Sequence, residues 1–178
     1  MSTTFIVFTD GSSTVYKNKN GIRFGGVGVF IEGYPEHNLS LSLSGEHITN
    51  QKAELLACIE AIKKCSSIAQ QKGLLKWSMI IYSDSMYTIK CATEWAPKWE
   101  ANGWKRKVGG RDQEVLNLKY VQELYKLVNK VNIKFIHVRS HQIEPSKNDP
   151  TWKLWYGNKI ADELAGNAML IISNQSNI

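Results

Sequence analysis

The order of strand and helix patterns along the chain constrains the fold more than any other feature. Three strand-like segments, residues 4–9, 25–32 and 38–44, follow one another with short connections, which favours antiparallel pairing. Two later strand-like segments, residues 77–83 and 132–138, are each preceded by helical patterns, which favours parallel crossovers. The sequence therefore predicts an α/β protein with a mixed five-stranded sheet, three antiparallel strands and then two parallel, flanked by helices.

Helical patterns fill most of the remaining chain. Apolar residues spaced for one helix face run from Leu55 to Cys65, and Thr49 or Asn50 is the candidate N-cap. Pro97 fits the first turn of a short helix better than the interior of a longer one. The other helices that the pattern predicts are residues 85–95, residues 114–129, and a last helix with apolar residues from Ile160 to Ala168.

Composition bounds the class of protein. The chain has 178 residues, of which 43% are hydrophobic and 21% charged, so we expect one packed domain. No apolar run approaches the roughly 20 residues of a membrane span, and the first residues lack the basic start of a secretory signal. Cys58 and Cys65 would lie about 10 Å apart along one helix, too far for a disulfide. With Cys91, they favour reduced thiols in an intracellular protein, cytoplasmic or nuclear and not secreted.

A basic stretch that also carries aromatic residues lies between residues 95 and 111. Glu100 is its only acid, and the whole chain has a formal net charge of +6. Cations contact phosphates and indole rings stack on sugars or bases, so the stretch favours a nucleic-acid surface. A solvated loop whose aromatic residues fold back onto the core is the alternative. Its cations and tryptophans are Lys98, Lys105, Arg106, Lys107, Arg111, Trp95, Trp99 and Trp104.

Two carboxylates stand where predicted strands end. Asp10 follows residues 4–9, and Asp84 follows residues 77–83. If these strands are parallel neighbours, their ends bring the two side chains together, and ligands gather at such ends in open α/β sheets. A turn or helix cap is the alternative for either residue alone.

Two further acids lie on predicted helices. Glu54 shares a helix face with the small residues Ala57 and Ala61, so an inward position would require a partner for its charge. An exposed acid near a helix N-terminus is the alternative. Asp162 is expected in the first turns of the last helix. Four converging carboxylates repel one another unless cations neutralise them, and hard oxygen ligands favour Mg²⁺.

Five short motifs occur in an order that resembles the ribonucleases H of type 1. The resemblance covers roughly residues 4–168, and the register of all five motifs with the strand and helix order makes it specific. It implies an RNase H-like fold. The motifs are Thr9-Asp10-Gly11-Ser12, Thr49-Asn50-Gln51-Lys52-Ala53-Glu54, Ser83-Asp84-Ser85, Val138-Arg139-Ser140-His141 and Gly157-Asn158-x-x-Ala161-Asp162-x-Leu164-Ala165.

The resemblance implies a metal-dependent endonuclease that cuts the RNA strand of an RNA–DNA hybrid, leaving 5′-phosphate and 3′-hydroxyl ends. It implies Asp10, Glu54, Asp84 and Asp162 as catalytic metal ligands for two Mg²⁺ ions, for which Mn²⁺ could substitute. His141 would act in turnover, by helping product and metal leave or by moving protons. The expected partner is an RNA–DNA hybrid; we expect a monomer, no membrane, and no protein partner that the sequence identifies.

The same resemblance implies a set of substrate contacts. Asn50 and Gln51 would contact the RNA strand in the minor groove, where 2′-hydroxyls distinguish RNA from DNA, although Asn50 is also a plain helix-cap candidate. Trp99 would line an aromatic channel for the DNA strand or pack between short helices. The other expected contacts are Ser12 in the first motif, Tyr87 in the aromatic channel, Trp104 and Lys105 in the basic protrusion, and Thr49 and Asn117 in a pocket for a DNA phosphate.

Three residues depart from the family pattern. His47 stands where the phosphate pocket has an arginine, Ser140 where a glycine precedes the loop histidine, and Lys159 where an acid is common. The expected organisation is a single catalytic domain over residues 1–178, with a core over about 4–169, a basic protrusion over 95–111, an inserted loop over 142–157 and a tail over 171–178.

Two other functions share some of these features. A DNA nuclease or strand-transfer protein also uses carboxylates at strand ends, and a hybrid-binding module without catalysis would share the binding surface. Asn50, Gln51 and the basic protrusion favour the hybrid over DNA. The presence of all four acids favours an enzyme over a binding module.

Overall fold

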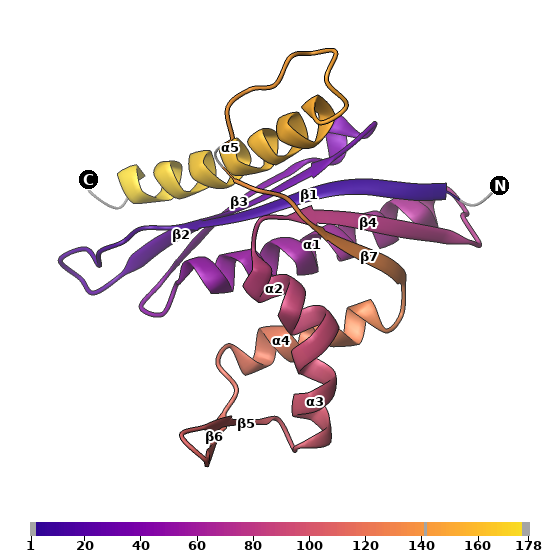
Figure 1. Ribbon diagram of the computed structural model, residues 1–178. Coiled ribbons are helices and arrows are strands. Elements are labelled where there is room, and N and C mark those ends of the chain that lie inside the picture. The colour runs from indigo at the N-terminus through magenta and orange to yellow at the C-terminus, as the bar shows by residue number, and fades with distance from the viewer. Residues whose placement is uncertain (1–2, 141, 176–178) are drawn as a thin grey trace.

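A five-stranded mixed sheet forms the centre of the molecule. The computed structural model describes residues 3–140 and 142–175. Figure 1 shows one helix lying along one face of the sheet and a second helix covering the other, which confirms the predicted architecture. The strand order is β3 (Leu39–Gly45), β2 (Arg23–Ile31), β1 (Thr3–Ser13), β4 (Trp77–Ser83), β7 (Asn132–His137), and the two helices are α5 (Trp152–Gln175) and α1 (Asn50–Gln71).

Strand β1 joins the antiparallel and parallel halves of the sheet. It pairs antiparallel with β2 and parallel with β4, while β4 pairs parallel with β7. The apolar run predicts a strand that stops at Asp10, and this boundary is wrong. Pairing with β4 ends where Thr9 lies opposite Ser83, but pairing with β2 continues until Ser13 lies opposite Gly25. Asp10 therefore lies on a rigid strand, one residue beyond the end of β4.

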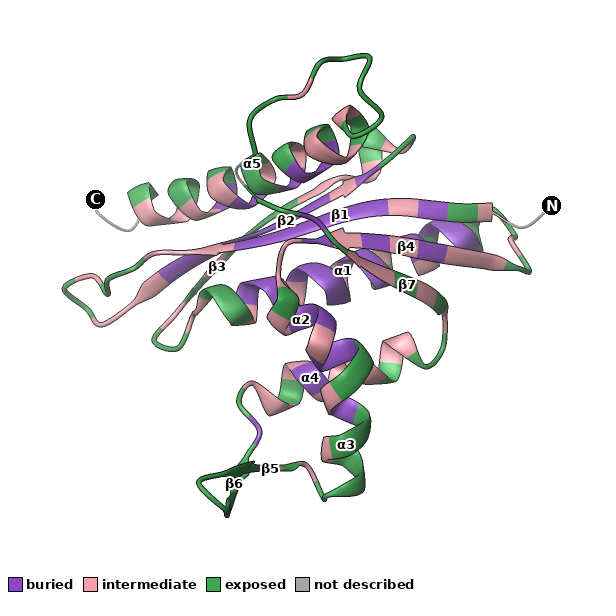
Figure 2. Ribbon diagram, in the orientation of Figure 1, coloured by how far each residue is buried: buried purple, intermediate pink, exposed green. Residues whose placement is uncertain are grey.

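Helix α1 covers the sheet with an apolar face. Thr49 is its N-cap, because the Thr49 hydroxyl accepts a hydrogen bond from the backbone nitrogen of Lys52 at 3.2 Å. Figure 2 shows a buried stripe along the side of α1 that faces the strands. Cys58 and Cys65 lie on this stripe, and both are free thiols together with the buried Cys91, as expected.

Helix α5 packs closely on β2 and β3. A Cβ atom at Gly28 would overlap the carbonyl oxygen of Ala161, so only glycine admits the helix at this distance. On β3, the Ser42 hydroxyl donates a hydrogen bond to the carbonyl oxygen of Ala168 at 2.7 Å. The serine face of β3 is therefore a contact surface for the helix.

A projecting arm lies beyond α1 and ends in a small hairpin (Figure 1). The helix expected over 114–129 begins only at Leu118, because Asn117 adopts a left-handed backbone conformation with φ of 57°. The hairpin is not predicted. The elements of the arm are α2 (Met86–Lys90), a π-helical turn (Cys91–Trp95), α3 (Ala96–Ala101) with Pro97 in its first turn, β5 (Lys105–Val108), β6 (Arg111–Glu114) and α4 (Leu118–Val128).

The last helix is longer at both ends than its pattern indicates. It begins inside the expected inserted loop, where the Asp149 carboxylate accepts hydrogen bonds from the backbone nitrogen and the hydroxyl of Thr151 at 2.8 and 2.6 Å. It ends at Gln175, so residues 171–175 of the expected tail are helical. Within the two described ranges, no helix combines the length and apolar character needed to cross a membrane.

Candidate active site

Three carboxylates from three separate elements meet at the end of β4. Asp10 lies on β1, Asp84 follows β4, and Glu54 lies in the first turns of α1. One carboxylate oxygen from each of the three lies within 4.8 Å of the others. Asp10 and Glu54 are buried and Asp84 is half-buried. The convergence expected from the parallel strand ends and the inward helix face is therefore present.

Gly11 determines how closely α1 approaches β1 at this point. A Cβ atom at Gly11 would overlap the backbone nitrogen of Glu54 and the carbonyl carbon of Ala53. The Gly11 nitrogen donates a hydrogen bond to Asp10 Oδ1 at 2.8 Å, which orients that carboxylate. The missing side chain thus permits Glu54 and Asp10 to share one site.

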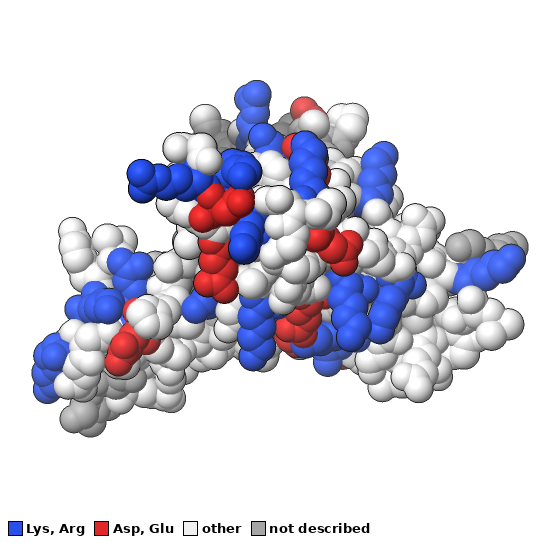
Figure 3. All heavy atoms as spheres, turned by 90° about the horizontal axis from the view of Figure 1, so that it is seen from below, with Lys and Arg blue, Asp and Glu red and all other residues white. Residues whose placement is uncertain are grey.

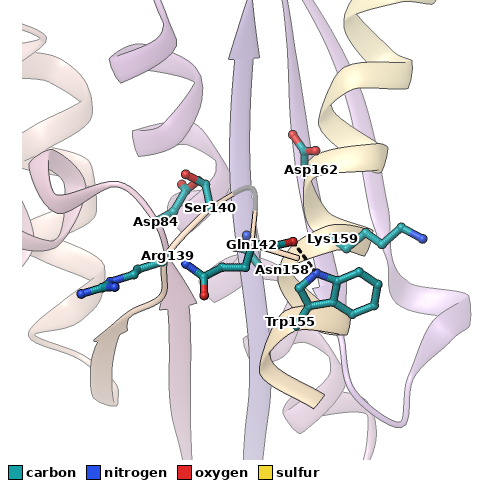
Figure 4. Close-up of a pocket in the computed structure, with 8 residues that line it drawn as sticks. All are labelled: Asp84, Arg139, Ser140, Gln142, Trp155, Asn158, Lys159 and Asp162. Carbon is teal, nitrogen blue, oxygen red and sulfur yellow. Dashed lines mark hydrogen bonds between the residues drawn. The ribbon is translucent and has the colours of Figure 1, made fainter. Parts of the chain in front are cut away.

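Asp162 reaches the same cavity from the opposite face of the sheet. Asp162 is exposed to solvent. It lies near the middle of α5 and not in the first turns as predicted, because the helix begins at Trp152. Asp162 lines a cavity of about 370 Å³ together with the other three carboxylates. Figure 4 shows its carboxylate on α5 across from Asp84. In the described part of the chain, Asp162 faces the cluster of three without joining it.

The crowded carboxylates hold protons more tightly than isolated ones. Burial raises the pKa of Asp10 from the ordinary 3.8 to about 8, and the negative charge of Asp84 adds to the effect. Burial also raises the pKa of Glu54 well above its usual value, with the charges of Asp10 and Asp84 as further causes. Each group is destabilised as an anion, so a cation placed among them would lower both pKa values.

The donor set fits a hard divalent cation. Asp10, Glu54 and Asp84 offer carboxylate oxygens in one small space, which is the ligand type that Mg²⁺ and Mn²⁺ prefer. Glu54 Oε2 is buried and has no hydrogen-bond partner among the described residues, and a buried acceptor of this kind needs one. Asp162 would complete the set from α5.

We expect the metal-free protein to become less stable as the pH rises from about 4 to about 8. A carboxyl group with a raised pKa in the folded state keeps its proton over this range, whereas the unfolded chain loses it, so deprotonation favours unfolding. Thermal unfolding of wild type and Asp10→Asn in EDTA measures this. As the pH rises, the Tm of Asp10→Asn should increase relative to the Tm of wild type. Adding Mg²⁺ should reduce this difference in Tm. Parallel Tm curves for the two proteins would contradict the raised pKa.

The RNA-strand contacts implied by the resemblance lie around this cavity. Asn50 and Gln51 are exposed at the start of α1, and both line the cavity beside Glu54. Ser12 also lines it, and the Ser12 hydroxyl donates a hydrogen bond to the Ala165 carbonyl oxygen at 2.9 Å. Their proposed contacts with RNA remain predictions, whereas their placement beside the carboxylates is observed.

The residues implied for the DNA strand lie on the arm and around α1. The Tyr87 hydroxyl accepts a hydrogen bond from Asn117 Nδ2 at 3.3 Å, which joins the expected channel to the expected phosphate pocket. Trp99 is half-buried against Trp95, with ring centres 5.5 Å apart, so the packing alternative is realised, although its remaining surface is accessible. Thr49 caps α1.

The hairpin of the arm, residues 105–114, is basic, with four cations against two acids. Trp104 packs edge-on against Tyr125, and Lys105 is exposed at the start of β5. Figure 3 views this side of the molecule and shows more Lys and Arg than Asp and Glu side chains on it. His47 is exposed beside Glu46, at 4.0 Å. This face suits a polyanion.

Arg139, Ser140 and Gln142, together with residues of α5, extend the site on the α5 side of the carboxylates. His141 lies outside the described residues, so its predicted role is untested. The second cavity beside the carboxylates was not predicted, although Arg139, Ser140 and Asn158 stand in the motifs quoted above. It is lined by Asp84, Arg139, Ser140, Gln142, Trp155, Asn158, Lys159 and Asp162 (Figure 4).

A mixed sheet with carboxylates gathered at its parallel strand ends defines an α/β protein with a candidate divalent-cation site. Comparison with known proteins narrows this class. The RNase H family model matches residues 2–170, so the chain belongs to the RNase H family.

Relatives of this family match most of the chain. Ribonuclease H of Schizosaccharomyces pombe is 33% identical over 160 residues, covering 90% of this chain and 51% of the relative. Ribonuclease H1 of Homo sapiens is 32% identical, covering 90% of this chain and 48% of the relative. The chain thus spans about half the length of these relatives. Ribonuclease H of Orientia tsutsugamushi is 33% identical over 177 residues, covering 96% of this chain and 88% of the relative.

Solved structures share the fold. The crystal structure of LC9-RNase H1, a type 1 RNase H with the type 2 active-site motif, has a TM-score of 0.66 at 24% identity, covering 95% of this chain and 73% of that one. The solution structure of the PFV RNase H domain has a TM-score of 0.67 at 20% identity and covers 94% of each chain. These likenesses establish the architecture of the sheet and its helices.

Proposed function

We propose that this protein is an endonuclease that hydrolyses the RNA strand of RNA–DNA hybrids, leaving 5′-phosphate and 3′-hydroxyl ends. The observation that carries the proposal is the meeting of Asp10, Glu54 and Asp84 within 4.8 Å in a chain of the RNase H family. Asp162 faces the same cavity from α5. The names of the relatives, ribonuclease H and ribonuclease H1, support the same substrate and reaction.

The chain's own residues would hold the reacting groups in place. Asp10, Glu54, Asp84 and Asp162 would bind two divalent ions, Mg²⁺ with Mn²⁺ as a substitute. Such ions supply an activated water and stabilise the charge on the leaving oxygen of a phosphodiester. Asp10 and Asp84 would be the central ligands, because Asp10 lies on β1 and Asp84 directly follows β4. His141 is proposed to act in turnover.

The entrance to the cavity would select the hybrid. Asn50 and Gln51 stand on its rim, one turn from Glu54, where donor and acceptor groups can meet a ribose 2′-hydroxyl in the minor groove. The basic arm would contact phosphates of the DNA strand. A duplex of two DNA strands lacks the 2′-hydroxyl, so we expect it to bind without being cut.

Cleavage of labelled substrates tests the proposal. End-labelled RNA–DNA hybrid, double-stranded DNA, double-stranded RNA and single-stranded RNA are incubated with the protein in Mg²⁺, in Mn²⁺ and in EDTA. We expect internal cuts in the RNA of the hybrid alone, only with a divalent ion, and products that a ligase can rejoin after annealing to DNA. Equal cleavage of double-stranded DNA would favour a DNA nuclease, and binding without cleavage would favour a binding module.

A further inference from the structure

A second cavity lies directly beside the carboxylates and shares two of them. Its volume is about 200 Å³, and Asp84 and Asp162 form the side that it shares with the acidic cavity. The other side comes from the residues after β7 and from the first turns of α5. Any group bound there would lie next to the reacting phosphate of a substrate held at the carboxylates.

Trp155 forms a fixed wall of this cavity. Its indole nitrogen donates a hydrogen bond to the carbonyl oxygen of Gln142 at 3.0 Å, drawn as a dashed line in Figure 4. The ammonium group of Lys159 lies 5.4 Å from the centre of the Trp155 ring. The bond and the cation fix the plane of the ring, and a pre-oriented aromatic surface suits stacking with a sugar or base.

Asn158 supplies an unsatisfied acceptor in the same cavity. The residue is 8% exposed, and its Oδ1 atom is buried with no hydrogen-bond partner among the described residues. Buried polar atoms are nearly always paired, and a bound ligand would supply the donor that the described residues do not. A hydroxyl group of a ribose is such a donor.

Two cations stand on opposite sides of the cavity. Figure 4 shows Arg139 and Lys159 extending away from each other, with Trp155, Asn158 and Gln142 between them. Across residues 3–140 and 142–175, Arg139 forms no ion pair. Lys159 lies 3.5 Å from Glu163, an exposed pair of low strength that a phosphate can replace. A nucleic-acid strand crossing this cavity would meet one cation on each side.

We propose that this cavity is a subsite for the RNA nucleotide next to the cleaved bond. Arg139 and Lys159 bind the flanking phosphates, Trp155 contacts the sugar or base, and Asn158 Oδ1 accepts a hydrogen bond from the ribose 2′-hydroxyl. The subsite rests on the proposed hybrid-cleaving function and adds to it a contact on the α5 side of the carboxylates. It gives Lys159, which stands where the family commonly has an acid, a role in substrate binding.

Matched lysine variants test the phosphate contact. Lys159→Ala and Lys153→Ala each remove one charge from α5 and leave one glutamate without its lysine, because Lys153 lies 3.8 Å from Glu32. We expect Lys159→Ala to raise KM for the hybrid about tenfold with little change in kcat, as for the loss of one charge-assisted hydrogen bond. The slope of log kcat/KM against log salt should fall by about 0.9. Lys153→Ala should leave both unchanged.

A chemically modified substrate tests the ribose contact. Hybrids that carry a single 2′-deoxynucleotide at either position adjoining the cut are compared on wild type and Asn158→Ala, with thermal unfolding as the check on folding. One such substitution should slow wild type severalfold and Asn158→Ala far less, because the variant has already lost the acceptor. If wild type cuts the hybrid, either of two results would overturn the subsite. One is that the two lysine variants behave alike. The other is that Asn158→Ala responds to the 2′-deoxynucleotide as wild type does. Wild type that cuts no hybrid would overturn the proposed function itself.

Discussion

Asp10→Asn is expected to lower hybrid cleavage by at least about 10³-fold while leaving hybrid binding nearly unchanged. Asp10 is buried in the carboxylate cluster, with oxygens of Glu54 and Asp84 within 4.8 Å, so its loss removes an anion next to both of them. The substitution keeps the size of the side chain. It also removes a group whose burial opposes ionisation, so the variant should fold at least as well as wild type. Single-turnover cleavage and a binding titration with labelled hybrid separate the two effects.

Glu163→Gln is the matched control for this experiment. The substitution neutralises an exposed acid next to Asp162 on α5, whose ion-pair partner is Lys159. We expect its cleavage rate to stay within about twofold of wild type, as for an exposed pair. Asp10→Asn with more than a tenth of wild-type activity, or with activity equal to Glu163→Gln, would contradict the assignment.

Gly11→Ala is expected to cost at least about 100-fold in cleavage and about 1–3 kcal/mol in the free energy of unfolding. The added methyl would overlap the backbone nitrogen of Glu54, so α1 must shift away from β1. That shift carries Glu54 away from Asp10. Denaturant unfolding and single-turnover cleavage under conditions where the variant is folded measure the two losses independently.

Gly166→Ala makes the same chemical change at a site with open space. A Cβ atom at Gly166 on α5 would have no neighbour within 4 Å. We expect unchanged cleavage and a gain of about 0.5–1 kcal/mol, because alanine is the better helix former. Gly11→Ala with wild-type stability and activity would show that the close approach of α1 does not position the carboxylates.

The fold was predictable wherever a segment's own pattern agrees with its packing. Residues 77–83 combine an apolar strand pattern with a buried parallel position, and β4 has those bounds. The start of α5 was not predictable from apolar spacing, because Trp152 follows Pro150 in a polar stretch and the helix begins through side-chain bonds of Asp149. The end of β1 depends on its pairing with β2, and the local sequence pattern of β1 does not show where that pairing stops.

The hairpin of the arm carried a signal that hydrophobic patterns do not detect. Both strands, β5 and β6, are exposed, so neither has the alternation of a half-buried strand. Gly109 and Gly110 both have positive φ, at 56° and 79°, and a Gly-Gly pair between two short segments is a recognised hairpin turn. Turn chemistry would have located it.

The site was predictable where rigid elements carry it. Asp10 and Asp84 follow from parallel strand ends, and Glu54 from a helix face whose neighbours are all small. To predict the position of Asp162, the length of α5 had to be known. To predict the second cavity, the path of the segment between β7 and α5 had to be known. A hydrogen bond to Gln142 holds Trp155 in position, and no helix or strand periodicity relates these two positions in the sequence.

Anomalous diffraction from crystals grown with Mn²⁺ tests the central claim most directly. The claim is that Asp10, Glu54 and Asp84, with Asp162 facing them, are a divalent-cation site. Data collected near the manganese absorption edge should show anomalous density among these carboxylates in wild type, and none there in crystals of Asp10→Asn. Wild-type crystals with manganese bound elsewhere and no density among the carboxylates would contradict it.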